Sequence, residues 1–146
     1  MYQVTFAQLR KAKLPQAVET ALTGTQLKQP VLVLTILDLY GLKAALLALG
    51  CSKQNKPLIV TLAKEFAESV AHLRTAAAAA DAATAGYAAA YADYAADAAD
   101  AAAAAAYAGY AADAAAAAAG AGRAEEEHKQ IEIMYKHLNE EPLCTK

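Results

Sequence analysis

"TAAAAADAATAGYAAAYADYAADAADAAAAAAYAGYAADAAAAAAGAG", residues 75–122, is the stretch of the chain that decides its fold. Alanine makes up 32 of these 48 residues, and alanine has the highest intrinsic helix propensity, so the tract should be helical almost without tertiary help. One straight helix of this length would extend about 70 Å, whereas a compact chain of 146 residues has a radius of gyration of about 15 Å. We therefore predict a helical hairpin or a bent rod.

Glycines mark the candidate breaks in this tract. Each glycine inside a helix costs about 1 kcal/mol relative to alanine. Gly86, Gly109 and the segment Gly120–Gly122 are therefore the places where the helix is expected to end. Of these, Gly120–Gly122 is the favoured turn.

A nine-residue phrase occurs twice in the tract, as YADYAADAA at 91–99 and as YAGYAADAA at 107–115. Tyrosines three or four residues apart, such as Tyr87, Tyr91 and Tyr94, lie along one edge of a helix, and aspartates line the neighbouring edge. On a straight helix the offset between the copies would turn the second one by about 160°. The repeat thus presents tyrosine on both sides of an unbroken rod, or on one shared surface if the rod is broken.

The tyrosines and aspartates of this region are the candidate partner-binding residues, because rigid aromatic side chains beside carboxylates suit a protein-binding surface. A structural interpretation competes with this one. Where helices meet through alanine faces, a few tyrosines can fill the remaining gaps, and aspartates keep the rod soluble. The candidates are Tyr87, Tyr91, Asp93, Tyr94, Asp97, Asp100, Tyr107, Tyr110 and Asp113.

The rest of the chain is predicted to form shorter helices that pack on the tract, giving a single all-α domain, a helical bundle over residues 1–146. Two short helices are predicted at 5–13 and 15–24, the second from Pro15 near its start and Gly24 after its end. The parts are a basic short-helix part, the alanine-rich tract, a C-terminal amphipathic helix and a tail: 1–74, 75–122, 123–141 and 142–146. In 56–74 the apolar stripe is Leu58, Leu62, Phe66, Val70 and Leu73. In 123–141 it is Ile131, Met134, Tyr135 and Leu138.

The most apolar stretch is PVLVLTILDLYGLKAALLALG, residues 30–50. It approaches the length of a membrane span, but Asp38, Gly41 and Lys43 interrupt it, and each charge would cost roughly 2.5–3.5 kcal/mol at the centre of a spanning helix. Its first half is also good strand material, yet it shows no alternation, and no second strand-like run is available to pair with it. We therefore predict two buried helices here and no membrane partner.

Charge is distributed unevenly, although the net charge is only −2. Residues 1–74 carry nine Lys or Arg against four Asp or Glu, a balance of +5. Residues 75–122 carry five Asp and no base, and residues 123–146 have a balance of −2. This asymmetry indicates either an electrostatic face for a partner or two halves of one domain that attract each other weakly.

No motif for catalysis, metal binding or phosphate binding stands out in the sequence. His128 and Glu132 are one helical turn apart, but no second pair supports a metal site. Cys51 and Cys144 lack a CxxC spacing and no apolar leader opens the chain, which favours a cytoplasmic protein with reduced thiols. We expect a protein that is not an enzyme and that uses no metal ion or cofactor.

The order of parts, LTILDLYGLKAALLALGC, then LAKEFAESVAHL, an alanine tract and a charged helix, resembles a group of alanine-rich immunity proteins and phage proteins. Members of that group often alternate aspartate with arginine, or carry tryptophan, where this chain has tyrosine. The resemblance implies an all-helical, non-catalytic protein that acts by binding. It would act either as an immunity protein that blocks a toxin or as a phage protein that counters a host defence. The resemblance assigns no site residues.

The preferred functional hypothesis is an inhibitor that occupies a protein partner, a toxin or a host defence component, through an acidic, tyrosine-bearing helical surface. An alternative is sequestration of an anionic nucleotide-like ligand, with bases stacking on tyrosines and basic side chains meeting phosphates. Ice binding is a third alternative, which the irregular spacing of the two threonines in the tract disfavours. Self-association into a homo-oligomer through the tract is also open.

Overall fold

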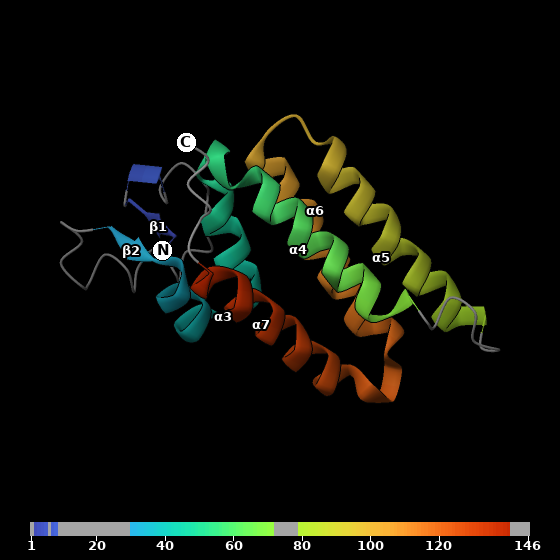
Figure 1. The fold of residues 1–146 in the computed structure, drawn as a ribbon. Helices are drawn as coiled ribbons and strands as arrows, with labels where there is room; N and C mark the ends of the chain where they lie inside the picture. Colours follow the sequence, from blue (N-terminus) through green and yellow to red (C-terminus); the bar gives the residue numbers. More distant parts are fainter. Residues whose placement is uncertain (1, 6, 9–29, 72–78, 141–146) are drawn as a thin grey trace.

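The computed structural model describes residues 2–5, 7–8, 30–71 and 79–140 (Figure 1). In this part of the chain, five α-helices and a two-stranded sheet form an all-α bundle, which confirms the predicted fold class. The helices are α3 (Val33–Gly50), α4 (Lys56–Ser69), α5 (Ala79–Asp97), α6 (Ala101–Ala118) and α7 (Arg123–Asn139). Most of the two helices predicted at 5–13 and 15–24 lies outside the described residues.

The alanine tract folds back on itself, so that α5 and α6 run antiparallel as a hairpin (Figure 1). The turn spans residues 98–100. Asp100 has an extended backbone (φ −136, ψ 168), and its carboxylate accepts a hydrogen bond from the Ala103 amide at 2.8 Å, which makes it the N-cap of α6. At the other side of the turn, Lys56 Nζ donates to the Ala98 carbonyl oxygen at 2.5 Å, which satisfies a backbone acceptor at the end of α5.

The sequence predicts one turn of the tract correctly and misses the other. Gly120–Gly122 forms a 3-10 turn between α6 and α7, and Gly120 has φ +54 there. Gly86 and Gly109, by contrast, lie inside α5 and α6, which continue through them. The break that makes the hairpin is instead set by Asp100, because a capping carboxylate satisfies helix-start amides that a glycine leaves unpaired.

Helix α6 is the centre of the bundle, since it contacts each of the other four helices. Helix α4 lies against the hairpin, and α5 forms its outer edge, packed mainly on α6 and α4 (Figure 1). Every buried side chain of α6 is an alanine: Ala101, Ala104, Ala105, Ala108, Ala111, Ala112, Ala115, Ala116 and Ala118. Backbones can approach closely where only methyl groups separate them.

Most of the predicted apolar stripes of α4 and α7 faces this core, but Ile131 is half-buried and lies outside the core cluster. On α4, Leu62 and Phe66 are buried, as is Val70 directly after its end, whereas Leu73 lies outside the described residues. On α7, Met134 and Leu138 are buried. The stripe also buries two polar residues that the sequence does not mark, Glu126 and Gln130. They precede Met134 and Leu138 at the same four-residue spacing, so they share that helix face.

Polar contacts join α7 to its neighbours. The Ser69 hydroxyl of α4 lies in hydrogen-bond contact with the buried Glu126 carboxylate. Near the other end of α7, the Tyr135 hydroxyl donates to the Asp38 carboxylate of α3, and this bond raises the pKa of Tyr135 above its usual value. Each contact ties a polar group at the edge of the core to a different helix.

The segment 30–50 departs from its prediction at one end. Val31–Leu32 forms a short strand, β2, which pairs antiparallel with β1 (Gln3–Val4). The expectation that no partner strand exists is therefore wrong. The sequence does not reveal this strand pair, because a pairing of two residues is too short to leave a sequence pattern. Gly41, with φ +80 and ψ −177, interrupts α3 and divides it into two helical pieces, as predicted.

Helix α3 is long and apolar enough to pass as a membrane span by length and composition, with a mean hydropathy of 1.7. Half of it is buried within the fold. A core helix of a soluble protein shows the same combination, so the structure is compatible with a soluble chain.

Gly50, at the end of α3, marks a close approach of α3 to α6. A Cβ atom placed on Gly50 would lie 2.8 Å from the Ala105 Cβ and 3.0 Å from the Ala101 carbonyl oxygen. Both neighbours belong to the central helix and have no flexible side chain that could move aside. The contact therefore requires glycine.

Replacing Gly50 with alanine should lower the free energy of unfolding by about 1–3 kcal/mol, the usual cost of overpacking. Gly86→Ala is the matched control, because its added methyl meets nothing within 4 Å. Alanine is the better helix former there, so this variant should gain about 0.5–1 kcal/mol. Chemical denaturation measures both changes, and a Gly50→Ala protein as stable as the wild type would contradict the close α3–α6 approach.

Larger side chains along α6 should destabilise the protein with a helical period, because its buried alanines recur along one side of the helix. Ala108 is fully buried and Ala117 is exposed. Ala108→Leu should destabilise the protein by about 1–3 kcal/mol, whereas Ala117→Leu should be nearly neutral. In a leucine scan of residues 101–118 followed by thermal unfolding, the losses should recur with the helical period. A flat profile would show that α6 is not packed through alanine faces.

Candidate functional site

Four tyrosines of the α5–α6 hairpin form one group of rings, here called the tyrosine cluster: Tyr91, Tyr94, Tyr107 and Tyr110. Between the helices, the ring centroids of Tyr91 and Tyr110 are 5.4 Å apart, and those of Tyr94 and Tyr107 are 5.6 Å apart. Within each helix the centroids are 6.3 Å and 6.4 Å apart. Each ring therefore contacts two others in the tilted or edge-on geometries that aromatic quadrupoles favour.

The turn at residues 98–100 explains why these rings meet. In an antiparallel hairpin, the first tyrosine of one copy of the repeat faces the second tyrosine of the other copy. Tyr91 accordingly meets Tyr110, and Tyr94 meets Tyr107. The two copies share one surface, which is the arrangement expected of a broken rod.

Three tyrosines of this region are exposed to solvent. The exposed fractions are 62% for Tyr87, 54% for Tyr94 and 53% for Tyr110. Tyr91 and Tyr107 are half-buried between the helices. The two interpretations of the tyrosines thus apply to different residues: Tyr91 and Tyr107 fill the gap between α5 and α6, and the others present rings to solvent.

The four candidate aspartates have separate roles. Asp100 is the N-cap of α6, and Asp113 pairs with Lys43 of α3, with 2.7 Å between the Lys43 Nζ and the carboxylate. Asp93 and Asp97 lie exposed on α5. Neither side chain makes an ion pair or hydrogen bond with another residue in the described part of the chain. Among the described residues, two of the four carboxylates therefore have a partner within the fold, and the side chains of the other two have none.

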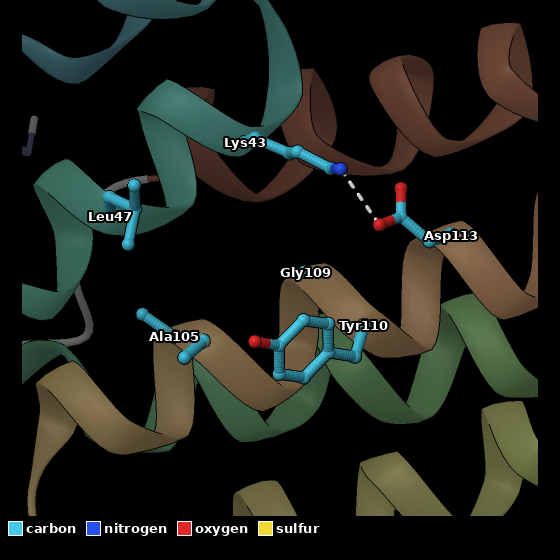
Figure 2. Close-up of a pocket in the computed structure, with 7 residues that line it drawn as sticks. Lys43, Leu47, Ala105, Gly109, Tyr110 and Asp113 are labelled. Carbon is cyan, nitrogen blue, oxygen red and sulfur yellow. Dashed lines mark ion pairs between the residues drawn. The ribbon is translucent and has the colours of Figure 1, made fainter. Parts of the chain in front are cut away.

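A groove of about 170 Å³ lies between α3 and α6 beside the tyrosine cluster (Figure 2). Tyr110 belongs to both, so the exposed rings continue into the groove. Leu47 and Ala105 give it apolar walls, and the Lys43–Asp113 pair lies at one end. Gly109, the residue that distinguishes the second copy of the phrase from the first, also lines this groove and leaves the space above it open.

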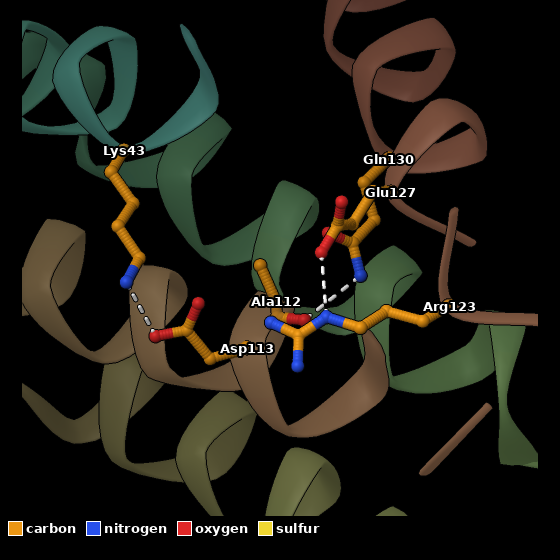
Figure 3. Close-up of polar contacts among 6 residues, drawn as sticks. All are labelled: Lys43, Ala112, Asp113, Arg123, Glu127 and Gln130. Atoms are coloured by element: carbon orange, nitrogen blue, oxygen red, sulfur yellow. Dashed lines mark hydrogen bonds and ion pairs between the residues drawn. The ribbon is translucent and has the colours of Figure 1, made fainter. Parts of the chain in front are cut away.

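A second hollow, of about 320 Å³, shares Lys43 and Asp113 with the groove and extends to α7. In this region the Arg123 Nε donates to the Glu127 carboxylate at 2.8 Å (Figure 3), which raises the pKa of Arg123 above its usual value. The buried Gln130 amide donates to the Ala112 carbonyl oxygen at 2.9 Å. Four of the polar residues that line the hollow therefore have partners within the protein: Lys43, Asp113, Glu127 and Gln130.

Lys43, Arg123 and Gln130 are not among the residues that the sequence marks as candidates. For Gln130, the four-residue spacing with Met134 and Leu138 is a usable signal. For Lys43 no local signal exists, because its partner Asp113 is far along the chain and is reached only through the packing of α3 on α6.

No group of three or more His, Cys, Asp or Glu side chains in the described ranges could hold a metal ion. His128 and Glu132, the pair noted in the sequence, lie on the exposed side of α7, with 3.3 Å between the His128 Nε2 and the Glu132 Oε1. Comparisons with protein-family models, curated proteins and solved structures gave no match. Function is therefore inferred from the geometry, exposure and charge of the surface.

Asp100→Ala should lower the free energy of unfolding by about 0.5–2 kcal/mol, because the variant loses the N-cap of α6. Asp93→Ala removes the same charge from an exposed helix position, so it should change stability by less than about 0.5 kcal/mol. Urea denaturation of both proteins tests this. Equal effects would show that Asp100 does not cap the helix.

Proposed function

We propose that this is a non-enzymatic binding protein, which inhibits a toxin or a host defence component by occupying it. The surface proposed to bind is the tyrosine cluster with Tyr87, Asp93 and Asp97, here called the tyrosine surface. The observation that carries the proposal is the exposure of Tyr94 and Tyr110, each more than half exposed, within a cluster of packed rings. The resemblance to alanine-rich immunity proteins supports the inhibitory role.

The geometry suits protein recognition in two ways. Tyrosine offers a large amphipathic contact area with few rotatable bonds, so little conformational entropy is lost on binding. The rings also stand on two packed helices and contact one another, so the surface is organised before a partner arrives. The alanines between the tyrosines give low relief, which lets a partner reach the rings.

Nucleotide sequestration has less support from the same residues. It would need cations beside the tyrosines to meet phosphates. Lys43, the base that lines the groove at Tyr110, is already paired with Asp113, and residues 75–122 contain no base. Within the described part of the chain, protein binding therefore accounts better for this surface.

We predict that Tyr94→Ala combined with Tyr110→Ala strongly weakens the capture of a partner protein. The bait would be tagged protein, presented to a host lysate or to cells that express a candidate toxin or defence protein. Loss of one aromatic hot spot typically costs 2 kcal/mol or more, so the affinity of the double variant should fall by roughly thirtyfold or more. Growth protection in cells that express the captured partner would test inhibition.

Leu39→Ala is the matched control, because Leu39 is a large exposed apolar side chain on α3, 65% exposed, and is not part of the tyrosine surface. It should capture the partner as well as the wild type does. Circular dichroism and thermal unfolding would show that both variants fold. If the folded double tyrosine variant captures the partner at wild-type levels, the tyrosine surface is not the binding site.

A further inference from the structure

Charge is unbalanced on the α5 side of the tyrosine surface. Asp97 follows Tyr94 by three residues, which places the two Cβ atoms about 5–6 Å apart on the same side of the helix. Both side chains are exposed, and Asp97 has no ion-pair partner in the described part of the chain. On the α6 side, the Asp113 carboxylate is already neutralised by Lys43 at 2.7 Å.

An exposed ring next to an unpaired carboxylate is complementary to one kind of side chain in particular. A guanidinium group is flat and always charged, so it can stack on an aromatic face while its edge donates two hydrogen bonds to a carboxylate. A lysine ammonium can pair with the carboxylate but has no flat face to stack. The tract contains no Lys or Arg of its own that would compete for the site.

We propose that the tyrosine surface recognises a basic segment of a partner protein, with an arginine of that segment stacked on Tyr94 and paired with Asp97. This inference rests on the proposed function and specifies the chemistry of the partner. A second copy of the chain fits less well, because it would bring Asp93 and Asp97 against the same carboxylates. Recognition through these charges also predicts an affinity that falls as salt is added.

The test uses three synthetic peptides of the form acetyl-(Ala-Ala-X)4-amide, in which X is arginine, lysine or citrulline. Citrulline keeps the shape of arginine and removes its charge. Binding is followed through the NMR signals of labelled tyrosine rings. The arginine peptide should shift the ring signals of Tyr94 in a saturable titration and bind roughly fivefold to tenfold more tightly than the lysine peptide. The citrulline peptide should not bind.

Two protein variants locate the effect. Asp97→Asn should weaken the arginine peptide by roughly threefold to tenfold. Glu132→Gln removes the same charge from an exposed position on α7, so it should leave binding within about twofold. Equal weakening by the two variants, equal affinity for the arginine and lysine peptides, or no saturable shift would each overturn the inference.

The outcomes separate this inference from the proposed function. If the tyrosine double variant loses its partner protein but the arginine peptide does not bind, the binding function stands and the basic partner is excluded. If the peptide binds at Tyr94 and Asp97 but partner capture does not depend on the tyrosines, the arginine site is supported and the proposed function fails. Saturable dimerisation that Tyr94→Ala abolishes, without peptide binding, would replace the basic partner with a second copy.

Discussion

The close approach of helices through alanine faces is the constraint on which the rest of this structure depends. Helix α6 touches four other helices, and all of its fully buried side chains are alanine methyl groups. With so little side-chain volume between them, the helices gain stability from dispersion contacts between backbones and methyl groups. In α3, Gly50 likewise allows the backbone to lie close to α6, because it has no side chain at all. The larger apolar side chains, such as Ile36, Phe66 and Met134, come from α3, α4 and α7, which close the core from outside the tract.

Much of this architecture can be predicted from the sequence, because it follows from local properties. Alanine propensity gives the helices of the tract, and three- and four-residue spacing gives the buried faces of α4 and α7. The turn at residues 98–100 is different, because Asp93, Asp97 and Asp100 look alike in the sequence. Only the folded chain selects Asp100 as the cap, and Lys56, far along the chain, completes the turn through the Ala98 carbonyl. Where a structural feature depends on a residue far along the chain, the local sequence shows no pattern that predicts it.

The candidate surface shows the same division. The repeat identifies the tyrosines, but whether they share a surface depends on where the rod breaks. The helical wheel cannot decide which tyrosines are exposed, because Tyr91 and Tyr94 are neighbours on one edge and yet only Tyr94 is more than half exposed. The Tyr91 ring contacts the Tyr110 ring across the hairpin, and that contact exists only after α5 and α6 have packed. Likewise, Asp113 resembles Asp97 in the repeat and differs only because Lys43 reaches it.

The six alanines between the cap and Tyr107 have a consequence of another kind. The length of this run, residues 101–106, sets the distance from the turn to the rings of Tyr107 and Tyr110. One alanine gained or lost there would keep the composition, the cap and the helix propensity, yet it would turn Tyr107 and Tyr110 by about 100° and move them by about 1.5 Å along the axis. Their rings would no longer meet Tyr91 and Tyr94. In a tract of such low complexity, the number of alanines between the tyrosines determines which side chains meet, as residue identity does in most proteins. Two chains of almost identical composition could therefore present completely different surfaces.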